Sequence, residues 1–118
     1  MRALLVEDEA LVAIVAEEAL TALGFQVEVT ASAAEAMAAV RRRQPHLAVV
    51  DLGLPDTDGG TLVASIKAAA PEAGIVIATG YEAGAILEKV SPALGAVIMT
   101  KPYSDADLAT AIRRLGLI

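Results

Sequence analysis

The segment LAVVDLGLP, from Leu47 to Pro55, runs from four consecutive apolar residues into an acid, Asp51. A short apolar run without polar alternation is typical of a strand covered on both faces, as in a parallel sheet. Functional groups of such sheets gather beyond the carboxyl ends of the strands. Asp51 therefore stands where the chemistry of the molecule is expected.

Similar runs of Val, Ile, Leu and Ala recur along the chain, and helical spacing fills the segments between them. The expected strands are Ala3–Val6, Gln26–Thr30, Leu47–Val50, Gly74–Ala78 and Ala96–Met99. The expected helices are Glu9–Leu23, Ala33–Arg43, Gly60–Ala70, Ala83–Val90 and Asp105–Leu115. This alternation predicts βαβ units, and hence an α/β fold in which helices sandwich a parallel sheet. Two helix starts carry capping-box patterns, Ser32 with Glu35 and Ser104 with Asp107.

Composition narrows the class of protein. A length of 118 residues predicts a single domain over residues 1–118, with no output domain after it. The net charge of −6 argues against nucleic acid or a membrane surface as the main partner. The absence of cysteine excludes disulfides and thiolate sites, and the single histidine leaves little for a zinc site or a catalytic triad. Without a membrane span or signal-peptide pattern, we expect a cytoplasmic protein.

The ends of four expected strands carry polar side chains that would meet at one rim of the sheet. These residues are Glu7, Asp8, Asp51, Thr79 and Lys101. Carboxylates gathered in a cleft repel one another unless a cation neutralises them, and an all-oxygen set suits Mg²⁺. A lysine supplies a point charge suited to phosphate. In that setting Asp51 would be a nucleophile that forms an aspartyl phosphate.

These motifs resemble those of two-component response-regulator receiver domains, the CheY-like family, over the whole length of the chain. The matching stretches are LLVEDE (4–9), VVDLGLPDTDG (49–59), IATG (77–80) and TKP (100–102). The resemblance implies a doubly wound five-stranded parallel sheet of order 2-1-3-4-5, flanked by five helices. It also implies a signalling switch in which Asp51 accepts a phosphoryl group from a histidine kinase or a phosphotransfer protein.

The resemblance further implies roles for individual residues. Mg²⁺ would be held by Glu7, Asp8, Asp51 and the backbone carbonyl of Gly53. Thr79 and Lys101 would contact the phosphoryl oxygens. The Lys101–Pro102 peptide bond would be cis, in the one sequence context where that isomer costs little. The phosphorylated form would change its interactions with a downstream protein, whose identity the sequence does not give.

The switch residues depart from the usual family pattern. The aromatic residue that usually rotates with the threonine is replaced by Ile98. The stretch IATGY (77–81) resembles the signature of FAT GUY receivers, a subclass that lacks the aromatic switch and is associated with HWE-type kinases. The resemblance thus points to Thr79, Gly80, Tyr81 and Ile98 as the residues of the switch.

Three residues are candidates for partner contacts. In the first expected helix, Leu11 and Ile14 lie off the apolar stripe that the helical spacing predicts. They either widen the buried face or form an exposed pair that docks a partner helix. Tyr103 is expected to pack at the partner face of the last helix. The predicted apolar stripe of the first expected helix consists of Val12, Val15, Ala16, Ala19, Leu20 and Leu23.

The protein is expected to be a monomer or a weak homodimer.

Other classes of protein fit the sequence less well. A phosphatase of the haloacid-dehalogenase type requires a second Asp two residues after the first, where Gly53 stands. A nucleotide- or flavin-binding module requires a glycine-rich loop where residues 7–9 are all acidic. We therefore expect a switch and not an enzyme. The remaining alternative is a receiver-like interaction module that works without phosphorylation.

Overall fold

The computed structural model describes residues 1–54, 56, 59–80 and 95–118. The strands are β1 (Arg2–Val6), β2 (Gln26–Thr30), β3 (Leu47–Asp51), β4 (Gly74–Thr79) and β5 (Val97–Thr100). The described helices are α1 (Ala10–Ala22), α2 (Ala33–Arg42), α3 (Gly59–Ala69) and α5 (Asp105–Arg114). The structure thus describes four helices where five were expected, and the remaining one, Ala83–Val90, lies outside the described residues.

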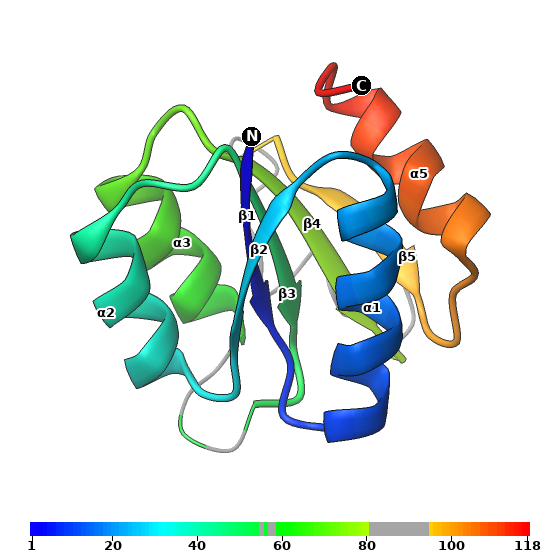
Figure 1. Cartoon of the computed structure of the whole chain (residues 1–118). Helices are drawn as coiled ribbons and strands as arrows, with labels where there is room; N and C mark the ends of the chain where they lie inside the picture. The colour runs from blue at the N-terminus through cyan, green and yellow to red at the C-terminus, as the bar shows by residue number, and fades with distance from the viewer. Residues whose placement is uncertain (55, 57–58, 81–94) are drawn as a thin grey trace.

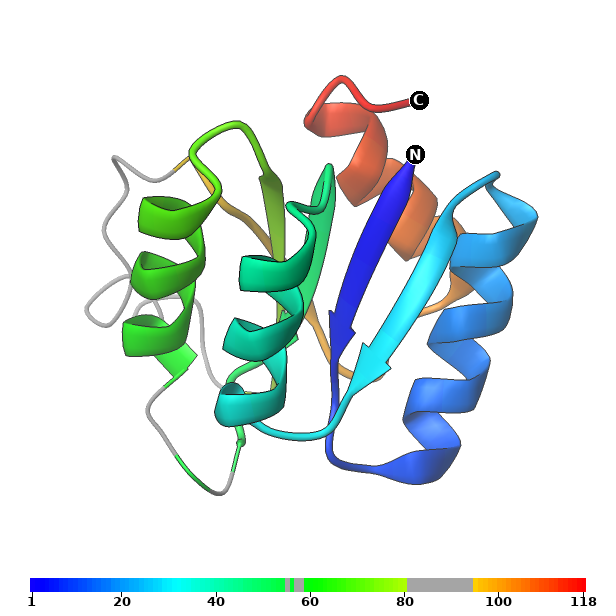
Figure 2. The same cartoon turned by 60° about the vertical axis from the view of Figure 1, so that its left-hand side comes forward.

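The five strands form one parallel sheet in the order β2-β1-β3-β4-β5, which confirms the predicted topology. Helices α1 and α5 cover one face of this sheet, and α2 and α3 cover the other (Figures 1 and 2). Since the strands are parallel, their carboxyl ends all lie along one edge of the sheet. Within the described part of the chain, no helix is long and apolar enough to cross a bilayer.

Successive residues of the central strands pack into two separate cores. In β1, Leu4 and Val6 face the core beneath α2 and α3, while Ala3 and Leu5 face the core beneath α1 and α5. Strands β3 and β4 alternate in the same way, and all five residues of β3 are buried. Burial on both faces explains why these strands are apolar without alternation.

Strands β3, β4 and β5 each end one residue later than the sequence predicted, and β5 ends at Thr100. β3 ends at Asp51, and the backbone N–H of Leu52 still donates to the carbonyl of Ala78 at 3.2 Å. β4 ends at Thr79, whose carbonyl accepts from the N–H of Lys101 at 2.8 Å. The backbones that carry the candidate site residues are therefore fixed by sheet hydrogen bonds.

The two capping patterns have different outcomes. Ser104 and Asp107 form both bonds of a capping box at the start of α5, as predicted. At α2, the hydroxyl of Ser32 accepts from the N–H of Glu35 at 3.2 Å. The carboxylate of Glu35 instead accepts from the N–H of Ala31 at 3.4 Å, so the second bond of that box is absent. Both helices nevertheless begin where the sequence predicted.

Helix α1 packs on the sheet through most of the predicted stripe, with Ala16, Ala19 and Leu20 buried and Val12 and Leu23 half-buried. Leu11 is 79% exposed and Ile14 is 52% exposed, so the alternative in which they widen the buried face is wrong. Val15, expected on the buried stripe, is also 57% exposed. The spacing therefore predicted the packing face but not its edge, where apolar residues lie on both sides of the stripe. The residues that do pack there are mostly small: Ala13, Ala16, Ala19 and Leu20.

Candidate functional site

The candidate site lies at the edge of the sheet formed by the carboxyl ends of the strands. Glu7 directly follows β1, and its N–H donates to the carbonyl of Thr30 at 2.9 Å, which extends the pairing with β2. Asp51 and Thr79 are the last residues of β3 and β4. Glu7, Asp51 and Thr79 are buried, whereas Asp8 is exposed. The sequence therefore placed these residues at the correct edge.

Lys101 joins the two buried carboxylates. Its Nζ lies 3.1 Å from Oδ2 of Asp51 and 3.1 Å from Oε1 of Glu7. Backbone N–H groups hold the second oxygen of each acid: Gly53 donates to Oδ1 of Asp51 at 3.0 Å, and Glu9 donates to Oε2 of Glu7 at 3.2 Å. Each carboxylate is thus held on both sides, which fixes its orientation. The peptide bond that follows Lys101 is cis, as predicted.

The pKa values of the two buried acids are shifted in opposite directions. Burial raises the pKa of Glu7 to about 7, and its hydrogen bond with Asp51 adds to the rise. Burial also opposes ionisation of Asp51. However, hydrogen bonds from Glu7, the Gly53 N–H and Lys101 outweigh burial and hold the pKa of Asp51 below its ordinary value. Asp51 is therefore the ionised member of the pair, as a nucleophile must be.

A third acid completes an all-oxygen cluster. Glu7, Asp8 and Asp51 each offer a carboxylate oxygen, and these oxygens all lie within 4.8 Å of one another. Three acids this close, without an imidazole or thiolate among them, suit a hard divalent cation such as Mg²⁺. The residues present therefore fit the cation that the sequence predicted. The part of the backbone carbonyl of Gly53 in such a site stays a prediction.

Glycine at position 53 adds no side chain beside the carboxylate of Asp51. A Cβ built at Gly53 would lie 3.6 Å from Oδ1 and 3.8 Å from Oδ2 of Asp51. These are ordinary contact distances, so any larger side chain at this position would lie directly over the acid. The nucleophile is buried within the sheet edge, yet no side chain from position 53 shields it.

The predicted switch residues are only partly within the described structure. Thr79 is buried and pairs in register with Thr100, next to the lysine. Gly80 is exposed, and a Cβ there would meet no described atom within 4 Å. Ile98 is half-buried and packs against the core beneath α2 and α3. Tyr81 lies outside the described residues, so its predicted role stays a prediction.

The arrangement of strand-end acids, lysine and threonine agrees with a comparison to known families. The model of the response regulator receiver domain matches residues 3–113. The chain belongs to this family. Receiver domains are the phosphoacceptor modules of two-component response regulators, and they receive the phosphoryl group from histidine kinases or phosphotransfer proteins.

Individual relatives support the same family. The receiver domain is 35% identical over 115 residues to the photosynthetic apparatus regulatory protein RegA of Rhodobacter capsulatus, covering 96% of this chain and 61% of RegA. It is 37% identical over 101 residues to the acid tolerance regulatory protein ActR of Rhizobium meliloti, covering 83% of this chain and 51% of ActR. The chain thus spans between half and two thirds of these relatives.

A solved structure supports the fold. A CheY-like receiver domain from Methanospirillum hungatei JF-1 superposes with a TM-score of 0.88 at 28% sequence identity. The superposition covers 97% of this chain and 91% of that chain. This similarity agrees with the strand order and the parallel sheet described above.

The candidate partner residues of this receiver domain line two different surface hollows. Leu11, Val15 and Tyr103 line one groove of about 470 Å³, and Lys101 lies at its edge. Ile14 lines a separate hollow together with Val29. Leu11 and Ile14 therefore do not act as one pair, whereas Leu11 and Tyr103 share a surface. Burial, together with the nearby charge of the Glu7 carboxylate, raises the pKa of the Tyr103 hydroxyl above its ordinary value.

One structural residue of the receiver domain was missed by the sequence analysis. The carboxylate of Asp56 accepts hydrogen bonds from the N–H groups of Ala33 at 2.9 Å and Ala34 at 3.1 Å. It thereby satisfies free donors at the start of α2 and ties the segment after β3 to that helix. Its partners lie 22 and 23 residues away, so no local pattern indicated this contact.

Proposed function

We propose that this receiver domain is a phosphoacceptor switch in which Asp51 takes a phosphoryl group from a histidine kinase or phosphotransfer protein in a Mg²⁺-dependent reaction. The phosphorylated form then changes its interactions with other proteins. It is proposed as a switch and not as an enzyme that releases a product. RegA and ActR are named as regulatory proteins, which is consistent with this role.

The observation that carries the proposal is the position of Lys101. Its Nζ contacts Asp51 and Glu7 at equal distances of 3.1 Å. A cation at this point balances the ionised nucleophile before phosphorylation and is within reach of new negative charge on a phosphoryl group. Phosphoryl transfer requires this kind of positioning and charge neutralisation more than covalent help from the protein.

The proposed reaction transfers a phosphoryl group from an imidazole nitrogen of the donor to the carboxylate of Asp51. A carboxylate oxygen of Asp51 forms a bond to phosphorus while the bond between phosphorus and the imidazole nitrogen of the donor breaks. The donor nitrogen keeps the electron pair. Glu7, Asp8 and Asp51 would hold Mg²⁺, which supplies charge neutralisation for the phosphoryl oxygens when bound. Thr79 and Lys101 are proposed to hydrogen-bond those oxygens.

The groove between α1 and the segment after β5 is the proposed docking place for the phosphodonor. It is lined by Leu11, Val15 and Tyr103, and its edge reaches Lys101. An apolar helix of the donor placed there would bring its phosphohistidine close to Asp51. Exposed apolar side chains of this size commonly mark a contact surface between proteins.

We further propose that the switch belongs to the FAT GUY type, whose partners include HWE-type kinases. Two features support this subclass. Ile98 occupies the position at which an aromatic rotor would be needed, and a Cβ at Gly80 would meet no atom of the described residues within 4 Å. A side chain with no rotatable ring cannot follow Thr79 in the usual way, so the movement would have to involve the chain that follows β4.

The proposal is tested by amide NMR spectra of the full chain with Mg²⁺, before and after addition of beryllofluoride, a mimic of aspartyl phosphate. The chain has no tryptophan, so fluorescence quenching offers no substitute. We expect saturable shifts at Asp8, Asp51, Thr79 and Lys101 that are lost in Asp51→Asn. Binding of Mg²⁺ without any response to beryllofluoride would overturn the proposal and favour a phosphorylation-independent interaction module.

A further inference from the structure

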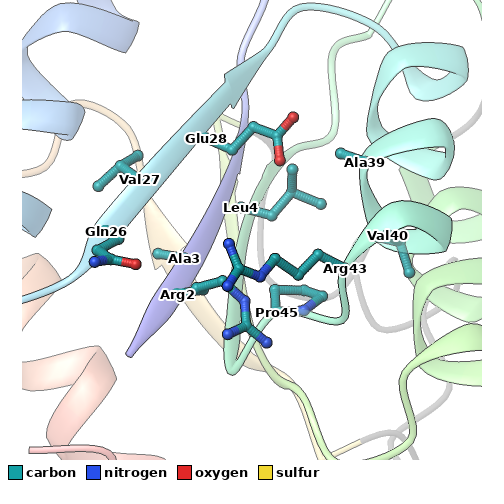
Figure 3. A pocket seen from close by; sticks show the side chains of 10 residues that line it. All are labelled: Arg2, Ala3, Leu4, Gln26, Val27, Glu28, Ala39, Val40, Arg43 and Pro45. Carbon is teal, nitrogen blue, oxygen red and sulfur yellow. The ribbon is translucent and has the colours of Figure 1, made fainter.

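Another cavity lies at the opposite end of the sheet from Asp51, where β1 and β2 begin. Its volume is about 190 Å³, and it is enclosed by these two strands, the end of α2 and the segment that leads to β3. Figure 3 shows its lining side chains. Glu7 directly follows β1, whereas Arg2 is the first residue of that strand. The cavity is therefore separate from the phosphorylation site.

The walls of this cavity are apolar and its two ends are charged. The guanidinium groups of Arg2 and Arg43 lie at one end, and the carboxylate of Glu28 lies at the other (Figure 3). Apolar side chains from the sheet, the helix and the following segment line the space between them. They are Leu4, Val27, Ala39, Val40 and Pro45.

The acid in the cavity is already neutralised by another residue. Oε2 of Glu28 lies 2.6 Å from Nη2 of Arg42, which is not among the residues that line the cavity. The ion pair of Glu28 is therefore made with Arg42 and leaves the charges of Arg2 and Arg43 to the cavity. The arginine end of the cavity keeps an excess of positive charge, although the chain as a whole carries a net charge of −6.

The side chain of Arg2 is held in place at one end of the cavity. Its Nη2 donates to the carbonyl of Gln44 at 2.6 Å. Its Nε is buried and has no hydrogen-bond partner among the described residues, so the terminal nitrogens are the donors that a ligand in the cavity can reach. Arg43, next to Arg2, offers further donors.

We propose that this cavity binds a small organic carboxylate with a compact apolar body. The carboxylate oxygens accept hydrogen bonds from the terminal N–H groups of Arg2 and Arg43, whose planar guanidinium groups match the shape of a carboxylate. The apolar body packs on Leu4, Val27 and Val40. The volume is below the roughly 300 Å³ at which pockets for drug-sized ligands begin, so the ligand is about the size of a single ring.

The walls favour a carboxylate over inorganic phosphate. Phosphate has no apolar part, so it would leave the surface of Leu4, Val27 and Val40 in contact with water. Burial of apolar surface is the main gain when a ligand enters a cavity of this kind. An organic acid gains from both ends of its structure, because its charge meets the arginines and its body meets the walls.

The test uses benzoate as the probe, added to the full chain and followed by amide NMR. We expect saturable shifts at Ala3, Leu4, Val27 and Val40. Benzamide, which has the same shape without the charge, and inorganic phosphate are each expected to bind at least about tenfold more weakly, since a charged hydrogen bond is lost in one case and apolar contact in the other.

Matched variants locate the binding site. Arg43→Gln is expected to weaken benzoate binding by about tenfold, because it removes one charged donor. Arg41→Gln, a charge-matched change at the same helix end but outside the cavity lining, is expected to leave binding unchanged. Asp51→Asn is also expected to leave it unchanged. The proposal is overturned if no saturable shift occurs, if benzamide binds as well as benzoate, or if both arginine variants behave alike.

Discussion

A side chain at position 53 would begin 3.6 Å from Oδ1 of Asp51. The residue present is glycine, and its backbone is not in the left-handed region that disfavours other residues. A larger residue therefore fits at this position without backbone strain. The absence of a side chain beside the nucleophile is thus a property of one replaceable residue, and we expect that residue to influence how easily water reaches a phosphorylated Asp51.

The first prediction concerns the lifetime of the phosphoryl group. Gly53→Met should slow its loss from Asp51 several-fold, because the added side chain would cover the carboxylate and hinder the attacking water. The measurement is the decay of phosphorylated protein after removal of the phosphodonor. Ala64→Met, which introduces the same side chain on the exposed side of α3, serves as the control. Unchanged decay in Gly53→Met would contradict the inferred water path.

The second prediction concerns the charge balance of the site. Lys101→Met should lower the free energy of unfolding without Mg²⁺ by about 1–2 kcal/mol, because Glu7 and Asp51 lose the cation between them. This loss of stability is smaller than that expected for a fully buried ion pair, because the Lys101 side chain is 22% exposed and solvent screens its charge. Added Mg²⁺ should reduce the loss, since it neutralises the same carboxylates. Urea unfolding followed by circular dichroism measures both effects.

Lys67 provides the control for that experiment. Its Nζ donates to the carbonyl of Ala73 at 2.7 Å, so it makes a neutral hydrogen bond away from the acidic cluster. Lys67→Met should therefore lose stability that Mg²⁺ does not restore. An equal response of both variants to Mg²⁺ would show that Lys101 does not act through charge.

The third prediction concerns the dependence of stability on pH. The N–H groups of Ala33 and Ala34 hold the pKa of Asp56 below its ordinary value. A group whose pKa is lowered by folding stabilises the fold above its unfolded pKa, about 3.9 for Asp, and loses that contribution as the pH falls through the folded value. The difference in unfolding midpoint between the parent and Asp56→Asn should thus shrink below pH 4.

Glu72→Gln is the matched control, because Glu72 is an exposed acid before β4. Its midpoint should follow that of the parent protein more closely over the same pH range. If the difference for Asp56→Asn stays constant from neutral to acidic pH, the ionised carboxylate is not what holds the start of α2.

The fourth prediction separates docking from chemistry. Leu11→Glu should slow phosphotransfer from the phosphorylated dimerisation domain of a histidine kinase, because it places a charge in the groove shared with Tyr103. Phosphorylation by acetyl phosphate, which needs no docking surface, should be unaffected. Thr21→Glu is the control, since Thr21 is exposed on the same helix and does not line the groove. Equal slowing by both variants would argue against the groove as the specific docking place.

The sequence predicted the site well where backbone topology decides position. Parallel strands end at one edge, so Glu7, Asp51 and Thr79 had to come together once the strands were recognised. It did not predict that Lys101 contacts both acids, because side-chain geometry at this scale depends on packing. Nor did it predict Asp56 as a cap for α2, because that contact joins segments that are far apart in sequence.

The predicted packing face of α1 is wrong at one position, Val15, because the helix has apolar residues on both sides of its buried stripe. Val15 and Ala16 are both apolar, yet the first is exposed and the second is buried. The alanine side of the helix packs on the sheet and leaves larger residues such as Leu11 in solvent. Hydrophobic spacing alone fails when a helix also presents an apolar outer face.

Strand β1 carries residues of two separate regions, the arginine cavity at its start and the acidic cluster just past its end. Arg2 at its start lines the arginine cavity, and Glu7 just past its end belongs to the acidic cluster. Its residues pair with β2 on one side and β3 on the other. A slip by a single residue would turn both side chains to the opposite faces of the sheet. Any substitution that loosens the pairing of β1 should therefore damage both regions at once, although they share no contact.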